Sequence, residues 1–256
     1  MADPDRPPES GLFPLESLPA HVSRSLPSTV STLGPLLAVA AILLFLPACS
    51  TAPAAQAGPA VDAGELTRTA QQASRLDRPY RLVFEWSVNE PDLRASGMGV
   101  ARVEPPYRAR LDLFSANGDR ILVAALVDDD VRIPEGLPAT VPPGPLLWGV
   151  LGILRPGPGF QPSGGEGSPS NPSRIAFRVA GGGEMDVRLS SGRIERMELR
   201  SVTGGREDVR LQFGEGERFP RQAIYRHHGE VRELRLNLEE VEQVEVFPSD
   251  IWSPGR

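Results

Sequence analysis

The sequence predicts a mainly β domain with few helices, built on a single curved antiparallel sheet that forms an incomplete β-barrel. About ten short segments between residues 80 and 246 alternate apolar and polar side chains, which is the period of a half-buried strand. Their connections are short and rich in Gly, Pro, Asn or Asp, as in antiparallel meanders. An apolar segment between the two groups of strands supplies a helix for the mouth of the open sheet.

Residues 1–48 have the pattern of a signal peptide. Leu36–Leu46 is an apolar run of 11 residues, which suits the hydrophobic region of a signal and is too short to span a bilayer. Residues 1–33 carry more acidic than basic groups, whereas the start of a signal peptide is normally positive. We therefore predict that residues 1–21 are not translated and that synthesis begins downstream, for example at Val22.

Cys49 is the only cysteine of the chain, which excludes an internal disulfide. Leu46-Pro47-Ala48-Cys49 resembles the lipobox of bacterial lipoproteins, although Pro47 departs from the usual small or β-branched residue. The resemblance implies cleavage before Cys49, a diacylglycerol on its sulfur and an acyl chain such as palmitate on its amino group, and no other cofactor is expected. The alternative is an ordinary signal peptide with a cysteine at this place by chance.

Residues 49–64 are mostly small, with nothing to bury, and predict a flexible, lipidated tether. The residue after Cys49 is serine, not aspartate, and the lipoprotein resemblance then implies sorting to the outer membrane, facing the periplasm. The net charge of −6 and the mixing of Arg with Asp and Glu argue against a nucleic-acid partner.

Residues 65–252 are expected to form the half-barrel domain. Leu66, Ala70, Ala73 and Leu76 recur at helical spacing and predict a first helix over 65–76. The predicted strands cover 80–88, 95–103, 107–115, 120–128, 131–134, 174–180, 184–190, 193–201, 207–213, 221–228 and 231–246. Between them we predict an apolar helix over 146–154 and a disordered loop over 157–173.

This order of elements resembles the LolA and LolB half-barrel carriers of bacterial lipids and lipoproteins. The resemblance rests on "GMGVARVEPPYRARLDLFSANGDRILVAALVDD" and on the ending "VFPSDIWSP". It implies a concave apolar face that shelters acyl chains, because each CH₂ removed from water contributes about 0.8 kcal/mol. The hairpin at 115–119 is short and polar, unlike the membrane-inserting loop of LolB, so we do not transfer that role.

The candidate residues of the ligand cavity are large and apolar and come from two strands and the apolar helix. They are Leu82, Phe84, Trp86, Leu111, Leu113, Leu147, Trp148 and Leu151. The same pattern is equally expected of residues that fill a closed core, and alternation alone does not distinguish the two.

The sequence contains no pattern of side chains that predicts catalysis, so we expect no enzyme. His227 and His228 are adjacent on a predicted strand and point to opposite faces, which predicts surface side chains rather than a metal site. Residues 128–130, "DDD", lack the spacing of a Ca²⁺ loop. The chain is predicted to be an outer-membrane-anchored lipoprotein that binds an acyl-chain ligand or lipoprotein cargo. The alternative is a non-enzymatic envelope scaffold or assembly lipoprotein with the same fold and no cavity, and the oligomeric state is left open.

Overall fold

The computed structural model describes residues 59–134, 141–167 and 173–254, all within one compact unit, Ala55–Arg256. The predicted signal region and Cys49 lie outside the described residues. Twelve strands follow one another along this unit. Their bounds are β1 Tyr80–Glu90, β2 Leu93–Glu104, β3 Arg108–Ser115, β4 Arg120–Val127, β5 Asp130–Arg132, β6 Phe160–Glu166, β7 Ser173–Val179, β8 Glu184–Ser190, β9 Arg193–Arg200, β10 Arg206–Gln212, β11 Gln222–His227 and β12 Arg232–Gln243.

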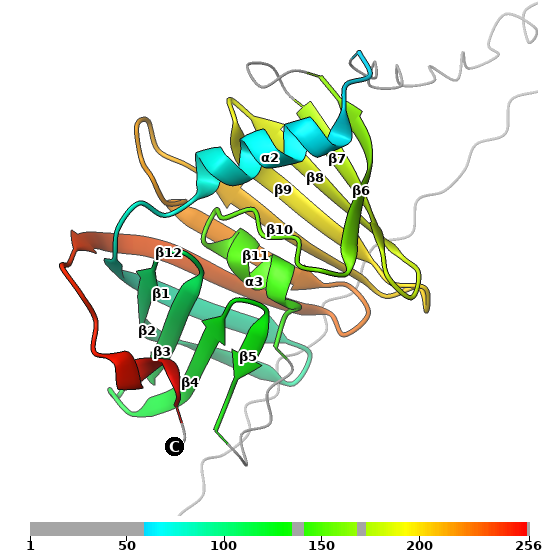
Figure 1. Cartoon of the computed structure of the whole chain (residues 1–256). Helices are drawn as coiled ribbons and strands as arrows, with labels where there is room; N and C mark the ends of the chain where they lie inside the picture. Colours follow the sequence, from blue (N-terminus) through cyan, green and yellow to red (C-terminus); the bar gives the residue numbers. More distant parts are fainter. Residues whose placement is uncertain (1–58, 135–140, 168–172, 255–256) are drawn as a thin grey trace, which may run out of the picture. The chain divides into compact units, whose positions relative to one another are not determined.

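All twelve strands belong to one sheet, and each neighbouring pair is antiparallel (Figure 1). The order is β5-β4-β3-β2-β1-β12-β11-β10-β9-β8-β7-β6, so β1 and β12 join the first strands of the domain to the last. β5 and β6 are the two edges and do not pair, which leaves the sheet open. The predicted incomplete barrel is therefore confirmed.

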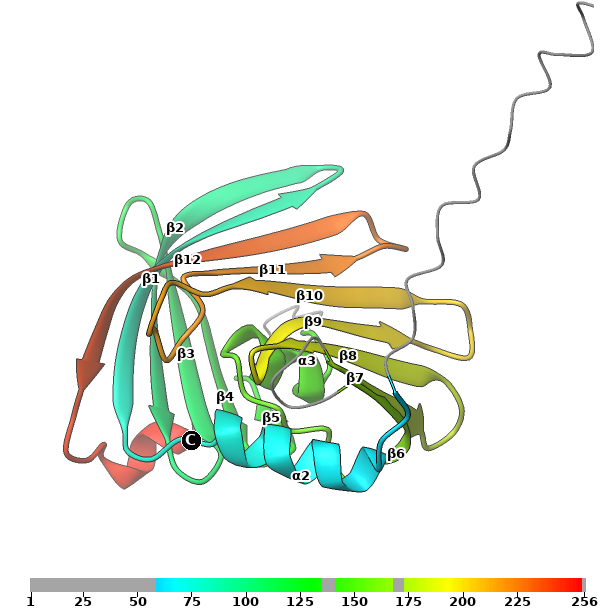
Figure 2. The same cartoon turned by 90° about the horizontal axis from the view of Figure 1, so that it is seen from above.

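Two α-helices, α2 (Ala63–Ser74) and α3 (Gly144–Val150), lie on the same side of this sheet. Figure 2 shows the sheet curling around them, and we call the surface that faces the helices the inner face and the opposite surface the outer face. α2 packs on β6, β7 and β9, and α3 packs on β9, β10 and β11. No helix in the described ranges is long and apolar enough to cross a membrane.

The start of α2 is fixed by its own sequence. Asp62 is the N-cap, and its carboxylate accepts a hydrogen bond from the backbone N–H of Glu65 at 2.6 Å. Immediately before it, Val61 donates to the carbonyl of Gly165 at 3.0 Å, and Gly167 donates to the carbonyl of Pro59 at 3.0 Å. The end of the segment predicted as a flexible tether is thus paired with the edge strand β6.

The predicted disordered loop at 157–173 is wrong over its first half. Phe160–Glu166 forms β6 and pairs with β7, with a register shift between Pro162 and Gly164. The shift accommodates a proline, which has no N–H for a regular ladder. The sequence suggested a loop because "FQPSGGE" shows no apolar alternation. Such a segment can still form a strand at the edge of a sheet, where Pro and Gly are tolerated.

The apolar helix is shorter than the predicted 146–154. Gly152 has φ +75°, and it ends the helix in a Schellman arrangement. The N–H of Gly152 donates to the carbonyl of Gly149 at 2.7 Å, and the N–H of Ile153 donates to that of Trp148 at 3.0 Å. Beyond this turn Ile153 and Leu154 stay buried in extended backbone.

The core consists of two apolar clusters on the inner face. One lies under α2 and the β7–β11 strands and contains Phe177, Met197 and Val209; the other lies on β1–β4. Residues of α3 enter both, since Leu146 belongs to the first cluster and Trp148 to the second. A Cβ on Gly149 would stand 2.5 Å from the sulfur of Met197, so a larger residue here would require the Met197 side chain to move.

The C-terminal segment packs against β3 and β4 through the 3₁₀ helix η1 (Ser249–Trp252). Trp252 is buried there, and its ring meets Phe247 edge-to-face at 5.9 Å between centroids. Arg110 donates to the carbonyl of Ile251 and Arg132 to that of Trp252, each at 3.0 Å.

Candidate functional site

The predicted β1 residues, Leu82, Phe84 and Trp86, all lie buried on the inner face. Their size is matched by small partners on β2, where Phe84 faces Gly99 and Trp86 faces Gly97. The indole N–H of Trp86 donates to the carbonyls of Met98 and Phe114, each at 3.1 Å. The aromatic side chains therefore lie along the sheet over the glycines of β2.

The predicted β3 residues, Leu111 and Leu113, lie on the same face. Leu111 pairs with Ala101 of β2 and Ala124 of β4, and Leu113 pairs with Gly99 and Leu122. Leu113 is buried and Leu111 is partly buried.

The three predicted residues of α3 differ in exposure. Trp148 is 0% exposed; its indole N–H donates to the carbonyl of Asp128 at 2.9 Å, and its ring meets Tyr107 edge-to-face at 5.8 Å. Leu147 and Leu151 pack against the same cluster but keep part of their surface exposed. Trp148 is thus a core residue, whereas the two leucines are accessible.

All eight predicted cavity residues thus gather in the β1–β4 cluster. Their placement together follows from the alternation of the strands and the position of α3. Several neighbours on this face are also only partly buried: Val88, Ala95, Leu122, Leu236 and Leu238. Whether these residues shelter a ligand remains a prediction.

A hollow of about 560 Å³ lies between α2 and the segment that follows α3. None of the eight predicted residues lines it. Its lining is Gly64, Thr67, Arg68, Gln71, Asp129, Arg155, Pro156, Gly157, Pro158, Phe160, Pro162 and Phe177. Its volume lies in the range of small-molecule pockets.

Arg155 is one of three charged residues that line this hollow, with Arg68 and Asp129, and sequence reasoning did not single it out. Its guanidinium lies 4.1 Å from the ring centroid of Tyr107 and pairs with Asp128 and Asp129 at 3.2 and 3.1 Å. Both partners belong to the "DDD" run at 128–130. Arg155 and Asp129 are separated by 26 residues, so the sequence gives no indication that they pair.

Buried tyrosines on the inner face remain uncharged. Burial and a hydrogen bond to Asp77 raise the pKa of Tyr80, and burial and a hydrogen bond to Glu207 raise the pKa of Tyr225. Both hydroxyls therefore act as neutral donors at any physiological pH.

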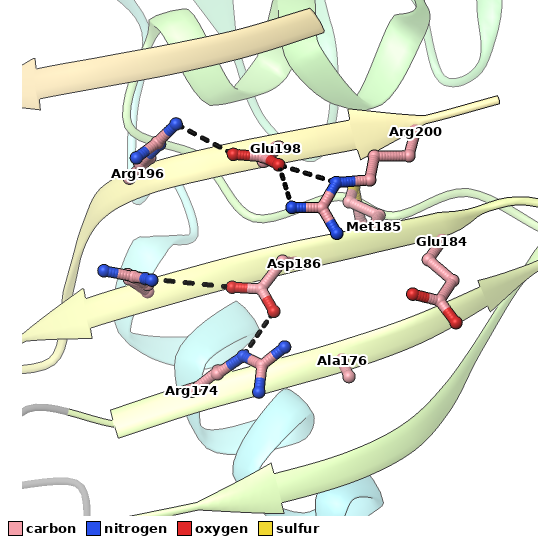
Figure 3. Close-up of a pocket in the computed structure, with 9 residues that line it drawn as sticks. Arg174, Ala176, Glu184, Met185, Asp186, Arg196, Glu198 and Arg200 are labelled. Atoms are coloured by element: carbon pink, nitrogen blue, oxygen red, sulfur yellow. Dashed lines mark hydrogen bonds and ion pairs between the residues drawn. The ribbon is translucent and has the colours of Figure 1, made fainter. Parts of the chain in front are cut away.

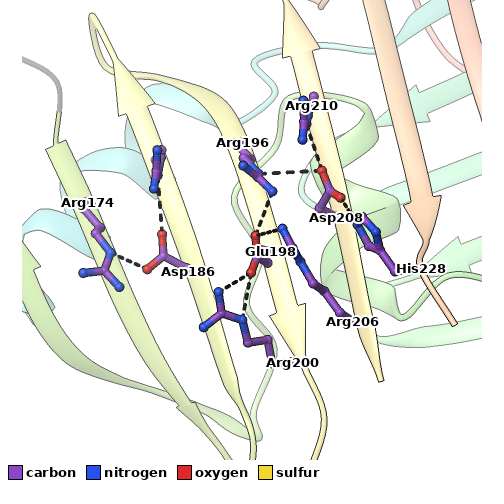
Figure 4. Close-up of polar contacts among 10 residues, drawn as sticks. Arg174, Asp186, Arg196, Glu198, Arg200, Arg206, Asp208, Arg210 and His228 are labelled. Atoms are coloured by element: carbon purple, nitrogen blue, oxygen red, sulfur yellow. Dashed lines mark hydrogen bonds and ion pairs between the residues drawn. The ribbon is translucent and has the colours of Figure 1, made fainter. Parts of the chain in front are cut away.

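The outer face of β7–β10 is strongly charged. Figure 4 shows arginines and carboxylates on the side of these strands away from the helices. Glu198 contacts Arg196, Arg200 and Arg206, and a shallow hollow of about 90 Å³ lies between it and Arg174 (Figure 3). Burial alone would raise the pKa of Glu198, but these arginines outweigh burial and hold its pKa below the usual range.

His228, predicted as a surface histidine, hydrogen-bonds the carboxylate of Asp208, which is 0% exposed. The contact could not be foreseen from sequence because the partners are 20 residues apart, Asp208 on β10 and His228 in the turn after β11. His227 accepts a hydrogen bond from the backbone N–H of Glu230 instead. Within 59–134, 141–167 and 173–254, no three His, Cys, Asp or Glu side chains are grouped to hold a metal ion.

Comparisons with known proteins identify the fold. Neither the protein-family models nor the curated protein sequences gave a match to this chain. Among solved structures, a LolA superfamily protein from Nitrosomonas europaea superposes with a TM-score of 0.50 at 12% identity, over 75% of this chain and 98% of that one.

Two further structures show a weaker likeness. A DUF1329 family protein from Desulfovibrio piger has a TM-score of 0.47 at 8% identity, over 75% of this chain and 96% of its own. A domain with a proposed role in outer membrane lipoprotein sorting, from Vibrio parahaemolyticus, has a TM-score of 0.43 at 9% identity, over 74% and 97%. The open twelve-stranded sheet, the helices on its inner face and the superposition on the Nitrosomonas protein together establish that this chain has a LolA/LolB-like fold.

Proposed function

We propose that this protein is a lipid-anchored protein of the bacterial envelope that binds an acyl chain, of a lipid or of a lipoprotein cargo, on its inner face. The observation that carries the proposal is the incomplete cover of the β1–β4 cluster. Leu147, Leu151, Leu236 and Leu238 lie together on the cluster and keep part of their apolar surface in water. An acyl chain laid along them would gain about 0.8 kcal/mol for each CH₂ that it buries.

The exposed leucine at the tip of the β1–β2 hairpin extends this apolar strip. Leu93 is 51% exposed and falls on the inner side of β2 by alternation with Ala95 and Gly97. An apolar side chain so exposed at a strand end supports an interaction with an apolar ligand or partner.

The proposed anchor is Cys49, acylated as in the lipoproteins that its lipobox resembles. Ten residues separate it from Ala60, which pairs with Glu166 at the edge of the sheet. A fully extended chain of this length reaches at most about 40 Å. The anchor would therefore keep the domain close to the periplasmic surface of the membrane.

Ligand binding is tested with the purified unit Ala55–Arg256, which contains the whole sheet and both clusters. Native mass spectrometry would detect a co-purified lipid, and a fluorescent fatty acid would measure uptake. We expect Leu147→Gln or Leu151→Gln to weaken uptake about tenfold, since each replaces accessible apolar surface by an amide. Val202→Gln, at a site 68% exposed on the β9–β10 turn, is the matched control and should have no effect.

A second candidate function, an envelope scaffold with no ligand, is favoured by the tight packing of Trp148 and its neighbours. It predicts that the wild-type unit carries no lipid and takes up no probe, and that crosslinking recovers protein partners. Absence of both bound lipid and uptake would decide for this second function. The anchor is tested separately, since Cys49→Ser should release the protein from membranes or leave it uncleaved.

A further inference from the structure

Six arginines form two neighbouring ion-pair networks on the outer face of β7–β10, one around Asp186 and one around Glu198 and Asp208. We call this surface the arginine face and define it by Arg174, Arg188, Arg196, Arg200, Arg206 and Arg210. They share three carboxylates, Asp186, Glu198 and Asp208, and Glu166 is a fourth at the edge of the networks. Glu184 lines the same hollow, so these six arginines stand against five carboxylates, on a chain whose net charge is −6.

The carboxylates stand in a row across three strands. Asp186 faces Glu198, and Glu198 faces Asp208, as direct cross-strand partners. Like charges placed opposite each other on neighbouring strands repel. The row is stable because arginines flank each member, with Arg210 at 3.0 Å and Arg196 at 3.6 Å from Asp208.

The two kinds of charge differ in their access to solvent. The side chains of Asp208 and Glu198 are 0% and 10% exposed, whereas those of Arg188 and Arg200 are 62% and 64% exposed (Figure 4). A guanidinium carries five N–H donors in a planar fork, and a single carboxylate cannot use them all. A ligand that approaches from solvent therefore meets arginine donors above carboxylates that are already neutralised.

The arginine face begins where the tether enters the domain. Ala60 pairs with Glu166 on β6, and Glu166 contacts Arg174 at 3.5 Å. If Cys49 is lipidated as proposed above, the chain reaches the membrane from this edge. The arginine face is then the charged surface that continues from the point of attachment.

We propose that the arginine face docks on the surface of an anionic phospholipid bilayer, with its exposed guanidinium groups on lipid phosphates. A phosphate accepts two parallel N–H donors from one guanidinium, which favours arginine over lysine for this contact. The charges spread over four adjacent strands about 4.8 Å apart, which suits a flat array of headgroups. The hollow among them is small, about 90 Å³, which is below the volume of typical ligand pockets.

The inference rests on the proposed anchor only for the location of the membrane. The test uses the unit Ala55–Arg256, which lacks Cys49, and vesicles of phosphatidylcholine with or without phosphatidylglycerol of the same acyl chains. We expect co-sedimentation with the anionic vesicles at low salt, its loss at high salt, and none with phosphatidylcholine alone. Uptake of acyl chains would not distinguish the two vesicles, so a preference reports the headgroup.

The variant Arg188→Gln with Arg200→Gln removes the two most exposed charges of the arginine face and should weaken binding roughly 25-fold, at about fivefold for each arginine. Arg94→Gln with Arg120→Gln removes the same charge from exposed sites on β2 and β4 and is the matched control. Melting temperatures of both variants would show that they are folded. An equal loss in both variants, or no preference for anionic vesicles, would overturn the proposal.

Binding of soluble polyglutamate, lost in the arginine-face variant and without vesicle binding, would instead identify an acidic polypeptide as the partner and the proposal would be wrong. The result is separable from the proposed function. Fatty acid uptake with no vesicle preference would contradict only the docking, and vesicle preference without uptake would contradict only the acyl-chain site.

Discussion

The ring of Phe84 occupies the space in which Gly99, its partner across the β1–β2 ladder, would carry a side chain. A Cβ built on Gly99 would stand 2.3 Å from the ring carbons Cε2 and Cζ of Phe84. Real Cβ atoms do not approach so closely, so either the ring or the strand would have to move. The glycine thus lets a large aromatic lie flat on the inner face.

Gly99→Ala should therefore destabilise the domain by about 1–3 kcal/mol, because it overpacks a filled core. Chemical denaturation of the purified unit would measure the change. Gly144→Ala is the control, since a Cβ on Gly144 would meet nothing within 4 Å and helix α3 begins there. Equal stability of the wild type and the Gly99→Ala variant would show that Phe84 has room to move.

Two of the buried tryptophans, Trp148 and Trp252, should respond differently to replacement by phenylalanine. The N–H of Trp148 donates to the carbonyl of Asp128, whereas that of Trp252 is buried with no hydrogen-bond partner among the described residues. Trp148→Phe loses volume and a buried hydrogen bond, although the carbonyl of Asp128 keeps Arg155 Nε as a donor at 3.3 Å, and it should cost about 2–3 kcal/mol. Trp252→Phe loses only volume and should cost less than about 1.5 kcal/mol.

Thermal or urea unfolding of both variants would compare them directly. Trp252→Ala should cost about 3–5 kcal/mol. A loss of this size would show that the ring itself stabilises the C-terminal segment. A Trp252→Phe variant less stable than Trp148→Phe would contradict the assignment of the two indole groups.

The sequence predicted the strands of this fold well because most have a buried and an exposed side. In β1, Tyr80, Leu82, Phe84 and Trp86 are all buried as their alternation required. The edge strand β6 was missed because Phe160–Glu166 has no such alternation and is held by backbone pairing to β7 and to Val61. Periodicity indicates which side chains are buried. It does not reveal a strand that is held in the sheet mainly by main-chain hydrogen bonds.

The candidate site was predicted in part for a similar reason. Alternation placed Leu111 and Leu113 on one face, but it carried no information about how far water reaches each: Leu113 is buried, whereas Leu111 keeps part of its surface exposed. Arg155 and Asp129 are 26 residues apart in the sequence, so no local sequence pattern predicts their contact.

The buried carboxylate of Asp208 stabilises the outer face through its cations. Asp208→Asn keeps the shape of the side chain but leaves Arg196, Arg210 and His228 facing a neutral amide. We expect a loss of about 2 kcal/mol, because hydrogen bonds to charged groups contribute about 1.5–3 kcal/mol. Glu242→Gln breaks the exposed pair with Arg81 and should cost less than about 1 kcal/mol.

Urea unfolding at pH 7 would compare these two variants. Equal stability of Asp208→Asn and the wild type would mean that the row of carboxylates does not hold the strands together. In that case the arginine face would be a solvated surface with little effect on folding.

The same carboxylates should make the domain sensitive to acid. Burial would raise the pKa of Asp208, but hydrogen bonds from His228 and Arg210 and the nearby arginine charges outweigh it and lower that pKa. Burial is likewise outweighed at Asp112, where Arg110 and Arg102 lower the pKa. An unfolded aspartate binds its proton near pH 3.9, above the pH at which these folded groups do. Between these two values the unfolded chain holds more protons, so the free energy of unfolding falls as the pH falls.

We therefore expect stability to be constant near neutrality, to decline below about pH 5, and to level off only after the pH passes the lowered pKa values. The stability difference between the wild type and Asp208→Asn should be largest at pH 7 and shrink toward pH 3, because protonation of Asp208 removes the charge that the variant lacks. Gly99→Ala changes no titrating group, so its difference from the wild type should stay the same across this range. A constant difference for Asp208→Asn as well would show that Asp208 does not owe its contribution to its charge.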